Sequence, residues 1–440
     1  MLNQIMIEKS ILFEILREQN FWYKLPEYDY VNRETYINSI KNHLTTKSIL
    51  IIQGPRRTGK TVLLKLIIQD MIKTIDKDQI LYVNLEDYRL FRYYSLDLLE
   101  KIYAVYRENV NPKNKVYFFI DEIQNIEEFE HFLRTKYDEA ENIKFIITGS
   151  NSKLLSKELA TLLTGRTLTF EIFPFSFIEY LQFKKEIITD YSYYSLEPKK
   201  YDLKHFFNIF LTTGSIPEYI DNPAKERLEE YFENVILKDI VERFRIRNTK
   251  LIKELGIYLL SNVSNITSYS SMKRTFNISI NTVKEYLSYL ESAYLFFTLN
   301  KFSYSYKNHI TSPSKVYCVD NGLVNLVSFK FSENKGKLYE NLVFLELKRN
   351  DYEIYYHGAK SECDFIVKKQ LKVIDAIQVA VSLNEEKTKN REIDGLIEAL
   401  NQYDLKEGLI LTEEDYTDLV VKNFKIKIRP LWFWLLNKND

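Results

Sequence analysis

Continuous runs of apolar residues recur through the first part of the chain, and helical patterns separate them. The apolar runs are SILIIQ (48–53), ILYVNL (80–85), KVYFFID (115–121) and IKFIIT (143–148), and TLTFEI (167–172) has the length of a further strand. The helical patterns between them lie at 61–75, 95–107 and 126–140. Apolar strands without alternation, joined through helices, are typical of a parallel sheet covered on both faces. We therefore expect residues 1–173 to form one α/β domain.

The rest of the chain changes pattern twice. Residues 174–248 are mostly helical, and we expect them to form a lid or linker region. Three short helical patterns and an extended segment follow in 249–302, an order typical of a winged helix, with Ser279 as the expected N-cap of the last helix. Helices alternating with strands in 303–440 predict a second, smaller α/β domain. The predicted fold class is thus α/β, with a parallel-sheet core, a helical and winged-helix region, and a smaller α/β domain.

Composition and charge argue against several classes of protein. The 61 Lys and Arg balance 61 Asp and Glu, so nucleic acid could be bound only through a local basic patch. The two cysteines, Cys318 and Cys363, have no CxxC spacing, which argues against a structural zinc site and a disulfide scaffold. Glu8 and Lys9 interrupt the segment where a signal peptide would need an apolar core, and no apolar run approaches the ~18 residues of a membrane span. We expect a cytoplasmic protein that does not enter a membrane.

The segment GPRRTGKT, between the first strand and the next helix, matches the phosphate-binding pattern G-x-x-x-x-G-K-[ST] at every position. Glycines give such a loop the torsions that let backbone N–H groups surround phosphate oxygens, and the helix that follows directs its positive dipole end at the anion. We expect Lys60 to contact the β- and γ-phosphates, and the Thr61 hydroxyl to be a ligand of Mg²⁺. The expected nucleotide-binding residues are Gly54, Pro55, Arg56, Arg57, Thr58, Gly59, Lys60, Thr61 and Val62.

Two adjacent carboxylates, Asp121 and Glu122, follow the apolar strand VYFFI. An aspartate at this strand end can hold Mg²⁺, directly or through water, as the second anionic anchor that a phosphate-binding loop lacks. The adjacent Glu122 can act on an attacking water as a general base or an orienting group. An acidic pair that merely caps a strand end is the simpler alternative. The presence of the phosphate-binding loop upstream favours the catalytic interpretation.

The next strand ends in three polar residues, Thr148, Ser150 and Asn151, any of which could contact the γ-phosphate or position the water. Ser150 or Asn151 could instead cap the helix that follows. Arg166, which follows that helix, is a candidate arginine finger, in cis or from a neighbouring subunit, although an ordinary surface arginine would look the same. Arg56 and Arg57 are further candidates for phosphate or inter-subunit contacts.

The C-terminal part carries acidic residues that could converge from a helix and two strands, as a metal site for phosphodiester cleavage requires. The candidates are Glu340 and Asp364, with Gln378 and Ala380 at the positions where a second carboxylate and a lysine would be wanted. Lys368, Lys372 or Lys387 could replace that lysine. Because a site with few anionic ligands binds a metal weakly, we expect an inactive version with a structural or binding role.

Motifs along nearly the whole chain resemble those of prokaryotic P-loop ATPases in which an AAA+-type core precedes a DUF4143 domain. They are GPRRTGKT, FIDEIQN, ITGSNSKLLSKE with LTGR, TTGSIPEYI, ISINTVKEYLSYLESAYL, SKVYCVDNGL, and GKLYENLVFLEL with ECDFIV. The resemblance implies a P-loop NTPase core of the additional-strand (ASCE) type that binds ATP and Mg²⁺ through the loop and Asp121, with Glu122 catalytic and Ser150 or a neighbour as sensor. It also implies a C-terminal domain similar to PD-(D/E)XK nucleases, carried by Glu340, Asp364 and Gln378, although Ala380 departs from that pattern.

Three functions are compatible with these features. The first is Mg²⁺-dependent ATP hydrolysis coupled to movement of the modules in 249–440, which would engage DNA or a protein partner. The second is an ATP-regulated, metal-dependent nuclease, and the third is a DNA-binding regulator whose conformation ATP sets. An arginine finger supplied in trans would require a homo-oligomer. The absence of an NKxD guanine-reading motif is consistent with ATP as the nucleotide.

Overall fold

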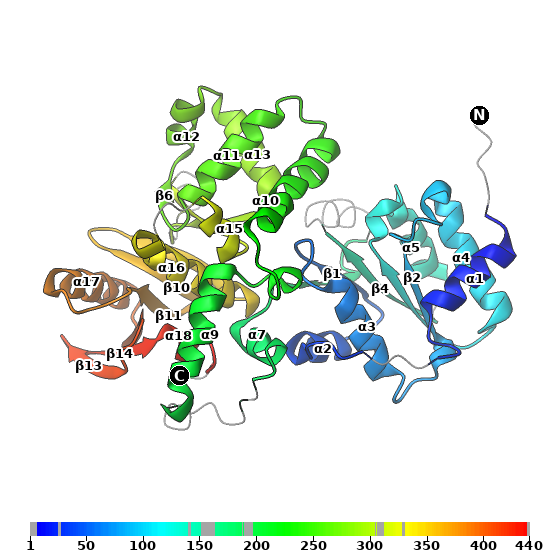
Figure 1. The fold of residues 1–440 in the computed structure, drawn as a ribbon, viewed down its shortest axis with the longest axis horizontal. Coiled ribbons are helices and arrows are strands. Elements are labelled where there is room, and N and C mark those ends of the chain that lie inside the picture. The colour runs from blue at the N-terminus through cyan, green and yellow to red at the C-terminus, as the bar shows by residue number, and fades with distance from the viewer. Residues whose placement is uncertain are drawn as a thin grey trace. The chain divides into compact units, whose positions relative to one another are not determined.

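The computed structural model describes residues 7–24, 28–139, 142–150, 163–186, 188, 197–303, 305, 312–327 and 331–437, with the side chains of 331–334 left aside. Two compact units divide the chain, Met1–Ile172 and Phe173–Asp440 (Figure 1). The finer division of the second unit into three regions stays a prediction.

The first unit contains a parallel five-stranded sheet. Its strands are β1 (Ile49–Gln53), β2 (Ile80–Asn84), β3 (Val116–Asp121), β4 (Ile143–Gly149) and β5 (Thr167–Glu171), in the order β2-β3-β4-β1-β5. One strand, β4, therefore separates the strand before the phosphate-binding loop from the strand that ends in Asp121. This is the additional-strand arrangement that the family resemblance implied, and the predicted α/β parallel-sheet core is confirmed.

Helices bury both faces of this sheet, which explains why its strands are continuously apolar (Figure 1). One face packs against α1 (Lys9–Gln19), α4 (Leu96–Asn109) and α5 (Phe129–Glu139), and the other against α2 (Glu34–Lys41) and α3 (Lys60–Met71). Alternate residues of one strand enter different cores: Ile51 packs on the first side, whereas Leu50 and Ile52 pack on the second. Burial on both faces leaves the polar chemistry to the strand ends.

The second unit begins with helices and a small antiparallel sheet. The helices are α7 (Phe177–Phe183), α9 (Lys200–Thr213), α10 (Lys225–Asn234) and a π-helix, η6 (Val235–Glu242). The elements α11 (Thr249–Ser261), β6 (Ile266–Thr267), α12 (Tyr269–Phe276), α13 (Ile280–Ser292), β7 (Phe296–Asn300) and β8 (Ser314–Cys318) follow. The Ser279 hydroxyl accepts from the backbone N–H of Thr282 (3.0 Å), which confirms the expected N-cap of α13. The sheet order is β6-β8-β7, so this sheet crosses the boundary expected at 302.

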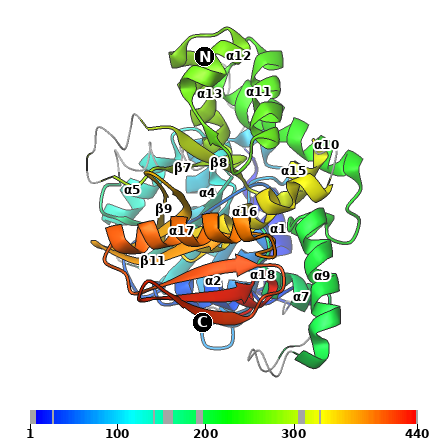
Figure 2. The same ribbon diagram turned by 90° about the vertical axis from the view of Figure 1, so that its left-hand side faces the viewer.

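A mixed six-stranded sheet completes the second unit (Figure 2). After α15 (Asn321–Leu326) come α16 (Phe331–Arg349), β9 (Glu353–Gly358), β10 (Glu362–Lys369), β11 (Lys372–Val379), α17 (Glu386–Gln402), β12 (Glu407–Thr412), β13 (Thr417–Val421), β14 (Phe424–Pro430) and α18 (Leu431–Trp434). The order is β13-β14-β12-β11-β10-β9, with β9, β10 and β11 antiparallel and β11, β12 and β14 parallel. The second α/β region predicted from the sequence is confirmed. In the part of the chain that the structure describes, no helix is long and apolar enough to cross a membrane.

Candidate functional site

The phosphate-binding loop joins the end of β1 to the start of α3, and its two glycines are required by the backbone. Gly54 has a φ of 155°, and a Cβ placed on it would lie 2.1 Å from the carbonyl oxygen of Ile172. Ile172 is held there because its backbone N–H donates to the carbonyl of Gln53 (2.7 Å). Gly59, with a φ of 85°, is the left-handed N-cap of α3. Another residue in either position would be strained or would displace the loop.

Lys60 lies over this loop rather than in solvent. Its side chain is almost fully buried, and Nζ donates to the carbonyl oxygens of Gly54 (3.1 Å) and Pro55 (2.8 Å). The Thr58 hydroxyl donates to the Pro55 carbonyl (2.9 Å), and Arg33 donates through Nη1 to the Thr58 carbonyl (3.0 Å). The sequence predicted the lysine. It did not predict Arg33, which lies outside the motif and reaches the loop only through the tertiary fold.

Asp121 is fully buried at the end of β3 and is held by hydroxyl groups from three other elements. Tyr82 of β2 donates to Oδ2 (3.1 Å), Thr148 of β4 donates to Oδ1, and the Thr61 side chain lies beside this carboxylate at the start of α3. Burial raises the pKa of Asp121 above its usual range, and the Thr148 and Thr61 hydroxyls oppose that rise. The structure therefore brings together Thr61 and Asp121, the two residues that the sequence proposed as ligands of Mg²⁺.

Glu122 has the left-handed backbone conformation, with a φ of 55°, as β3 gives way to a 3₁₀ turn (Ile123–Asn125). Its backbone N–H donates to the Thr148 hydroxyl (2.8 Å), so one buried threonine contacts both adjacent acidic residues. Gln124 donates through Nε2 to the Glu122 carboxylate and also to the Ser150 hydroxyl (3.5 Å). Ser150 is thereby connected to Glu122 through Gln124, whereas Asn151 lies outside the described residues.

Glu86 is a third acidic residue near this edge of the sheet. Partial burial raises the pKa of Glu86, and the carboxylates of Glu122 and Asp121 raise it further, whereas Arg56 and Lys60 lower it. The Glu86 side chain therefore interacts electrostatically with the acidic pair and with the phosphate-binding loop. Sequence reasoning missed Glu86, as it missed Tyr82 and Gln124. The available signal was that β2 ends at the same edge of a parallel sheet as β1, β3 and β4.

Arg166 is not brought to this edge. Its guanidinium pairs with the Asp138 carboxylate (3.0 Å) and lies 5.1 Å from the centre of the Tyr137 ring. Its carbonyl accepts the backbone N–H of Ile49, the first residue of β1, whereas the phosphate-binding loop follows the last residue of that strand. Arg166 therefore lies at the opposite end of β1 from its own loop, where only a neighbouring subunit's nucleotide could be within reach.

In the second unit, the acidic residues predicted at its nuclease-like centre are brought together, with a lysine among them. Lys315 of β8 donates from Nζ to Oε1 of Glu340 (2.9 Å) on α16 and to Oδ1 of Asp364 (2.8 Å) on β10. It also pairs with Oε1 of Glu362 (2.6 Å). The Tyr317 hydroxyl donates to the same oxygen of Glu340 (2.6 Å). The sequence singled out two of the carboxylates but not Lys315.

Gln378 of β11 adjoins this centre. Its side-chain oxygen accepts the backbone N–H of Asp364 (3.1 Å), and its amide donates to Glu392 of α17. Ala380 is buried and apolar, as the sequence shows. Of the lysines proposed as substitutes, Lys368 pairs with Glu353 (2.6 Å), and Lys372 and Lys387 are exposed. In the part of the chain that the structure describes, these three lysines form no hydrogen bond or ion pair with Glu340 or Asp364, and Lys315 takes that place.

Two motifs that the sequence left without a role, TTGSIPEYI and SKVYCVDNGL, meet through Asp320. This buried carboxylate accepts from the backbone N–H (2.5 Å) and the hydroxyl (2.9 Å) of Ser215 and from the N–H of Gly322 (2.8 Å). A Cβ on Gly214 would lie 2.0 Å from its Oδ1. The contacts explain these motifs as a structural joint between the end of α9 and the start of α15.

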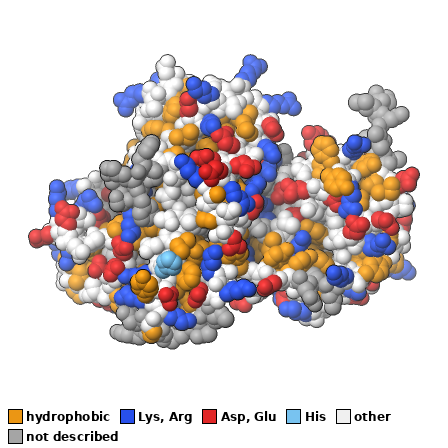
Figure 3. All heavy atoms as spheres, in the orientation of Figure 1, with side chains coloured by type: hydrophobic (Ala, Val, Ile, Leu, Met, Phe, Trp, Pro, Cys, Tyr) orange, Lys and Arg blue, Asp and Glu red, His pale blue; other side chains and the backbone are white. Residues whose placement is uncertain are grey.

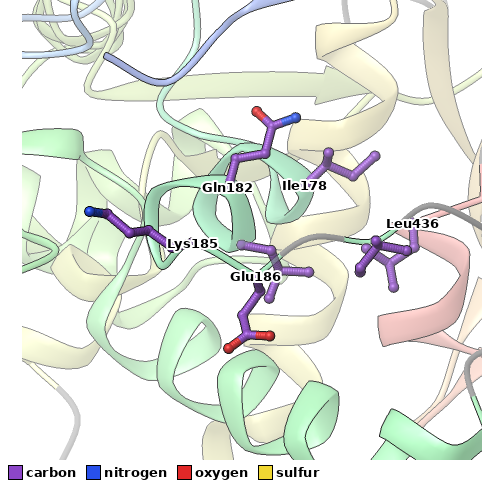
Figure 4. Close-up of a pocket in the computed structure, with 7 residues that line it drawn as sticks. Ile178, Gln182, Lys185, Glu186 and Leu436 are labelled. Carbon is purple, nitrogen blue, oxygen red and sulfur yellow. The ribbon is translucent and has the colours of Figure 1, made fainter. Parts of the chain in front are cut away.

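Other surface features do not add to these two centres. A small pocket beside α7 is lined by Ile178, Leu181, Gln182, Lys185, Glu186, Ile188 and Leu436 (Figure 4), and it contains none of the residues that the sequence singled out. On the face shown in Figure 3, acidic and basic side chains are interspersed, in keeping with the zero net charge.

Comparison with known proteins agrees with the architecture of the first unit. A family model described as "AAA domain" matches residues 46–181, so the chain carries an AAA-type P-loop ATPase domain. The family model that matches residues 207–334 is a domain of unknown function, DUF8612, rather than the DUF4143 domain that the sequence resembled.

Full-length relatives define the family. The uncharacterized protein MJ1544 of Methanocaldococcus jannaschii is 38% identical over 451 residues, 98% of this chain and 96% of that protein, and the chain belongs to the same family. An uncharacterized protein of Haemophilus influenzae is 29% identical over 90% of this chain and 96% of its own length. Among solved structures, the Walker-type ATPase PABY2304 of Pyrococcus abyssi aligns with a TM-score of 0.46 and 15% identity, over 69% of this chain and 97% of that one.

Proposed function

We propose that the first unit binds ATP with Mg²⁺ and hydrolyses it. The observation that carries this proposal is that the Thr61 and Asp121 side chains come together at the edge of the sheet where Lys60 lies over a glycine loop. Hydroxyl and carboxylate oxygens are ligands that suit Mg²⁺. When bound, the ion would neutralise charge on the phosphate oxygens, which is the principal electrostatic need of phosphoryl transfer.

The neighbouring residues then have distinct tasks. The loop N–H groups from Gly54 to Val62 and the Lys60 ammonium hold the phosphates, and Glu122 orients or deprotonates the attacking water. Ser150 acts on the same water or on the γ-phosphate, in concert with Glu122 through Gln124. Arg166 acts as an arginine finger from a neighbouring copy, because it lies at the far end of its own sheet, and this requires a homo-oligomer.

Steady-state ATP hydrolysis with Mg²⁺ tests the proposal. Lys60→Ala should abolish nucleotide binding, whereas Glu122→Gln should retain binding of a fluorescent ATP analogue and lose turnover. Lys73→Ala is a matched control, because it removes a lysine from the exposed ion pair with Asp70 near the end of α3. Full turnover in Glu122→Gln would refute its assignment as the base, and unchanged nucleotide binding in Lys60→Ala would refute the site itself.

Hydrolysis is coupled, in this proposal, to a macromolecular partner of the second unit. The order α11-β6-α12-α13-β7-β8, with an antiparallel β6-β8-β7 sheet, is that of a winged helix and favours DNA as the partner. Lys273 and Arg274 at the end of α12 supply local positive charge. If DNA binds here, duplex DNA should stimulate ATP turnover, and binding should weaken steeply as salt increases.

A double substitution of Lys273 and Arg274 by alanine should remove both DNA effects while basal ATP hydrolysis remains. DNA binding and stimulation that survive this change would move the interface elsewhere. No stimulation by any DNA would favour a protein partner.

The two cysteines are buried and not disulfide-bonded, which supports a cytoplasmic location.

A further inference from the structure

The Lys315 ammonium occupies the middle of the carboxylate cluster in the second unit. Its side chain is only 2% exposed, and it lies within 2.9 Å of carboxylate oxygens from Glu340, Glu362 and Asp364. An ammonium group has three N–H donors, and here three carboxylates engage it. The cation of this centre is therefore supplied by the protein itself.

Two of these carboxylates have further partners. The second oxygen of Asp364 accepts the backbone N–H of Val379 (3.0 Å), and Glu340 accepts the Tyr317 hydroxyl on the oxygen that faces Lys315. Burial and the neighbouring Asp364 carboxylate raise the pKa of Glu340, whereas the Lys315 charge opposes that rise and favours the ionised form. A divalent ion entering this centre would have to displace the ammonium from three ion pairs.

The rest of the centre also departs from a metal-dependent nuclease. Gln378 replaces a carboxylate, and its amide is used to bridge Asp364 and Glu392. The position two residues on is the buried Ala380. Within the described residues, no group of three or more His, Cys, Asp or Glu side chains is arranged to hold a metal ion. With Lys315 in place, the centre therefore does not fit the divalent metal that a PD-(D/E)XK nuclease needs.

We propose that Lys315 is the resident cation of this centre: its ammonium takes the place of a divalent metal and fastens β8 to α16 and β10. The consequence for function is that the second unit does not cleave phosphodiesters. These buried ion pairs also hold the β6-β8-β7 sheet against the six-stranded sheet. This proposal is independent of ATP hydrolysis by the first unit.

Manganese binding to the full-length, nucleotide-free protein tests this. Mn²⁺ equivalents are counted by electron paramagnetic resonance for wild type, Lys315→Ala, Lys315→Ala/Asp364→Asn and Asp364→Asn. We expect Lys315→Ala to gain one equivalent over wild type and the double variant to lose it. Asp364→Asn alone should bind as many equivalents as wild type. Lys335→Ala, which removes another lysine ion pair of α16 (with Glu413, 2.5 Å), is the control and should gain none.

Plasmid nicking with Mn²⁺ completes the test and does not depend on whether Lys315→Ala folds. Wild-type protein should leave supercoiled plasmid intact. If Asp364→Asn lowers the Mn²⁺ count of an otherwise unaltered chain, or if wild type nicks plasmid and Asp364→Asn does not, the proposal is overturned and Lys315 becomes the relocated lysine of a nuclease. A folded Lys315→Ala protein that gains no Mn²⁺ also overturns it, because the ammonium would then not stand in a cation site.

Discussion

Thr148 offers a sharp test of how the nucleotide site is built. It is fully buried on β4, between the loop strand and the Asp121 strand, and its single hydroxyl donates to the Asp121 carboxylate while accepting the backbone N–H of Glu122 (2.8 Å). Thr148→Val exchanges the hydroxyl for a methyl group of nearly the same volume. The change therefore removes two hydrogen bonds with little effect on packing.

The expected loss of stability follows from those two bonds. A hydrogen bond to a charged group contributes about 1.5–3 kcal/mol, and a buried N–H left without an acceptor costs about 1–3 kcal/mol. Asp121 keeps its Tyr82 and Thr61 neighbours, so we expect the lower half of the sum, about 2.5–4 kcal/mol. Glu122 also loses an anchor of its left-handed backbone, with a φ of 55°, and its displacement should lower kcat by about 10- to 100-fold.

Native-state hydrogen exchange of β3 and β4 peptides measures the stability change within the first unit, separately from unfolding of the second. ATP turnover measures the effect on Glu122. Thr148→Ser is the matched control, because it keeps the hydroxyl and removes only one buried methyl group, at a cost of about 1 kcal/mol. If Thr148→Val shows wild-type protection and wild-type turnover, the bridging role of this hydroxyl is refuted.

Three further predictions concern charge and backbone geometry. Burial raises the pKa of Asp121, and a cation binds the deprotonated form of its carboxyl group. The affinity for Mg²⁺–ATP should therefore rise with pH, and binding should release a proton. Calorimetry in buffers of different ionisation heat measures that proton release. Burial lowers the pKa of His357 below the ordinary value of about 6.5. The stabilisation by the neutral imidazole is therefore complete above about pH 6.5 and is lost as the pH falls below that value. Thermal unfolding between pH 5 and 8 measures this loss. Gly214→Ala should destabilise far more than Gly165→Ala. Both glycines have positive φ (87° and 73°), but Gly214 also has a ψ of −171°, a conformation nearly restricted to glycine, and its new Cβ would lie 2.0 Å from Asp320.

Each of these has a control and a contrary outcome. Asp121→Asn should show no pH dependence beyond that of the nucleotide itself, and an equal dependence in both proteins would exclude Asp121 as its source. His357→Gln should flatten the fall in stability below pH 6.5, and an unchanged slope would assign it to other groups. Equal melting temperatures for the two glycine variants would show that the contact between Gly214 and Asp320 is easily relieved.

The parallel-sheet core and the grouping of most of the candidate site at one edge could be predicted because their signals are local. GPRRTGKT is one continuous segment between a strand and a helix, and Asp121 and Glu122 directly follow an apolar strand. In a parallel sheet covered on both faces, loops at the carboxyl ends of the strands gather at one edge, so separate local signals predict a common site. The same reasoning could have added Glu86, which follows β2 at that edge.

The choice among the polar residues after β4 could not be made from the sequence, because all three are polar and adjacent. The structure uses the Thr148 hydroxyl between Asp121 and Glu122 and connects Ser150 to Glu122 through Gln124. Arg166 shows the opposite case. It directly precedes the strand expected at 167–172, and a residue before a strand of a parallel sheet lies at the edge opposite the phosphate-binding loop, so its position could have been predicted.

By itself, the sequence determined the features that depend on residues close together along the chain. These are a parallel α/β core, a phosphate-binding loop, an acidic strand end, and the presence of Glu340 and Asp364 on separate elements of a second α/β region. Only the tertiary structure decided what charge those two carboxylates meet. Lys315 is 25 residues from Glu340 and 49 from Asp364 along the chain, and it reaches them because β8 packs beside α16. Charge pairs between residues far apart along the chain produce no periodic or local pattern in a sequence. The sequence of a strand that contains a lysine is the same whether that lysine contacts water, a carbonyl or three carboxylates.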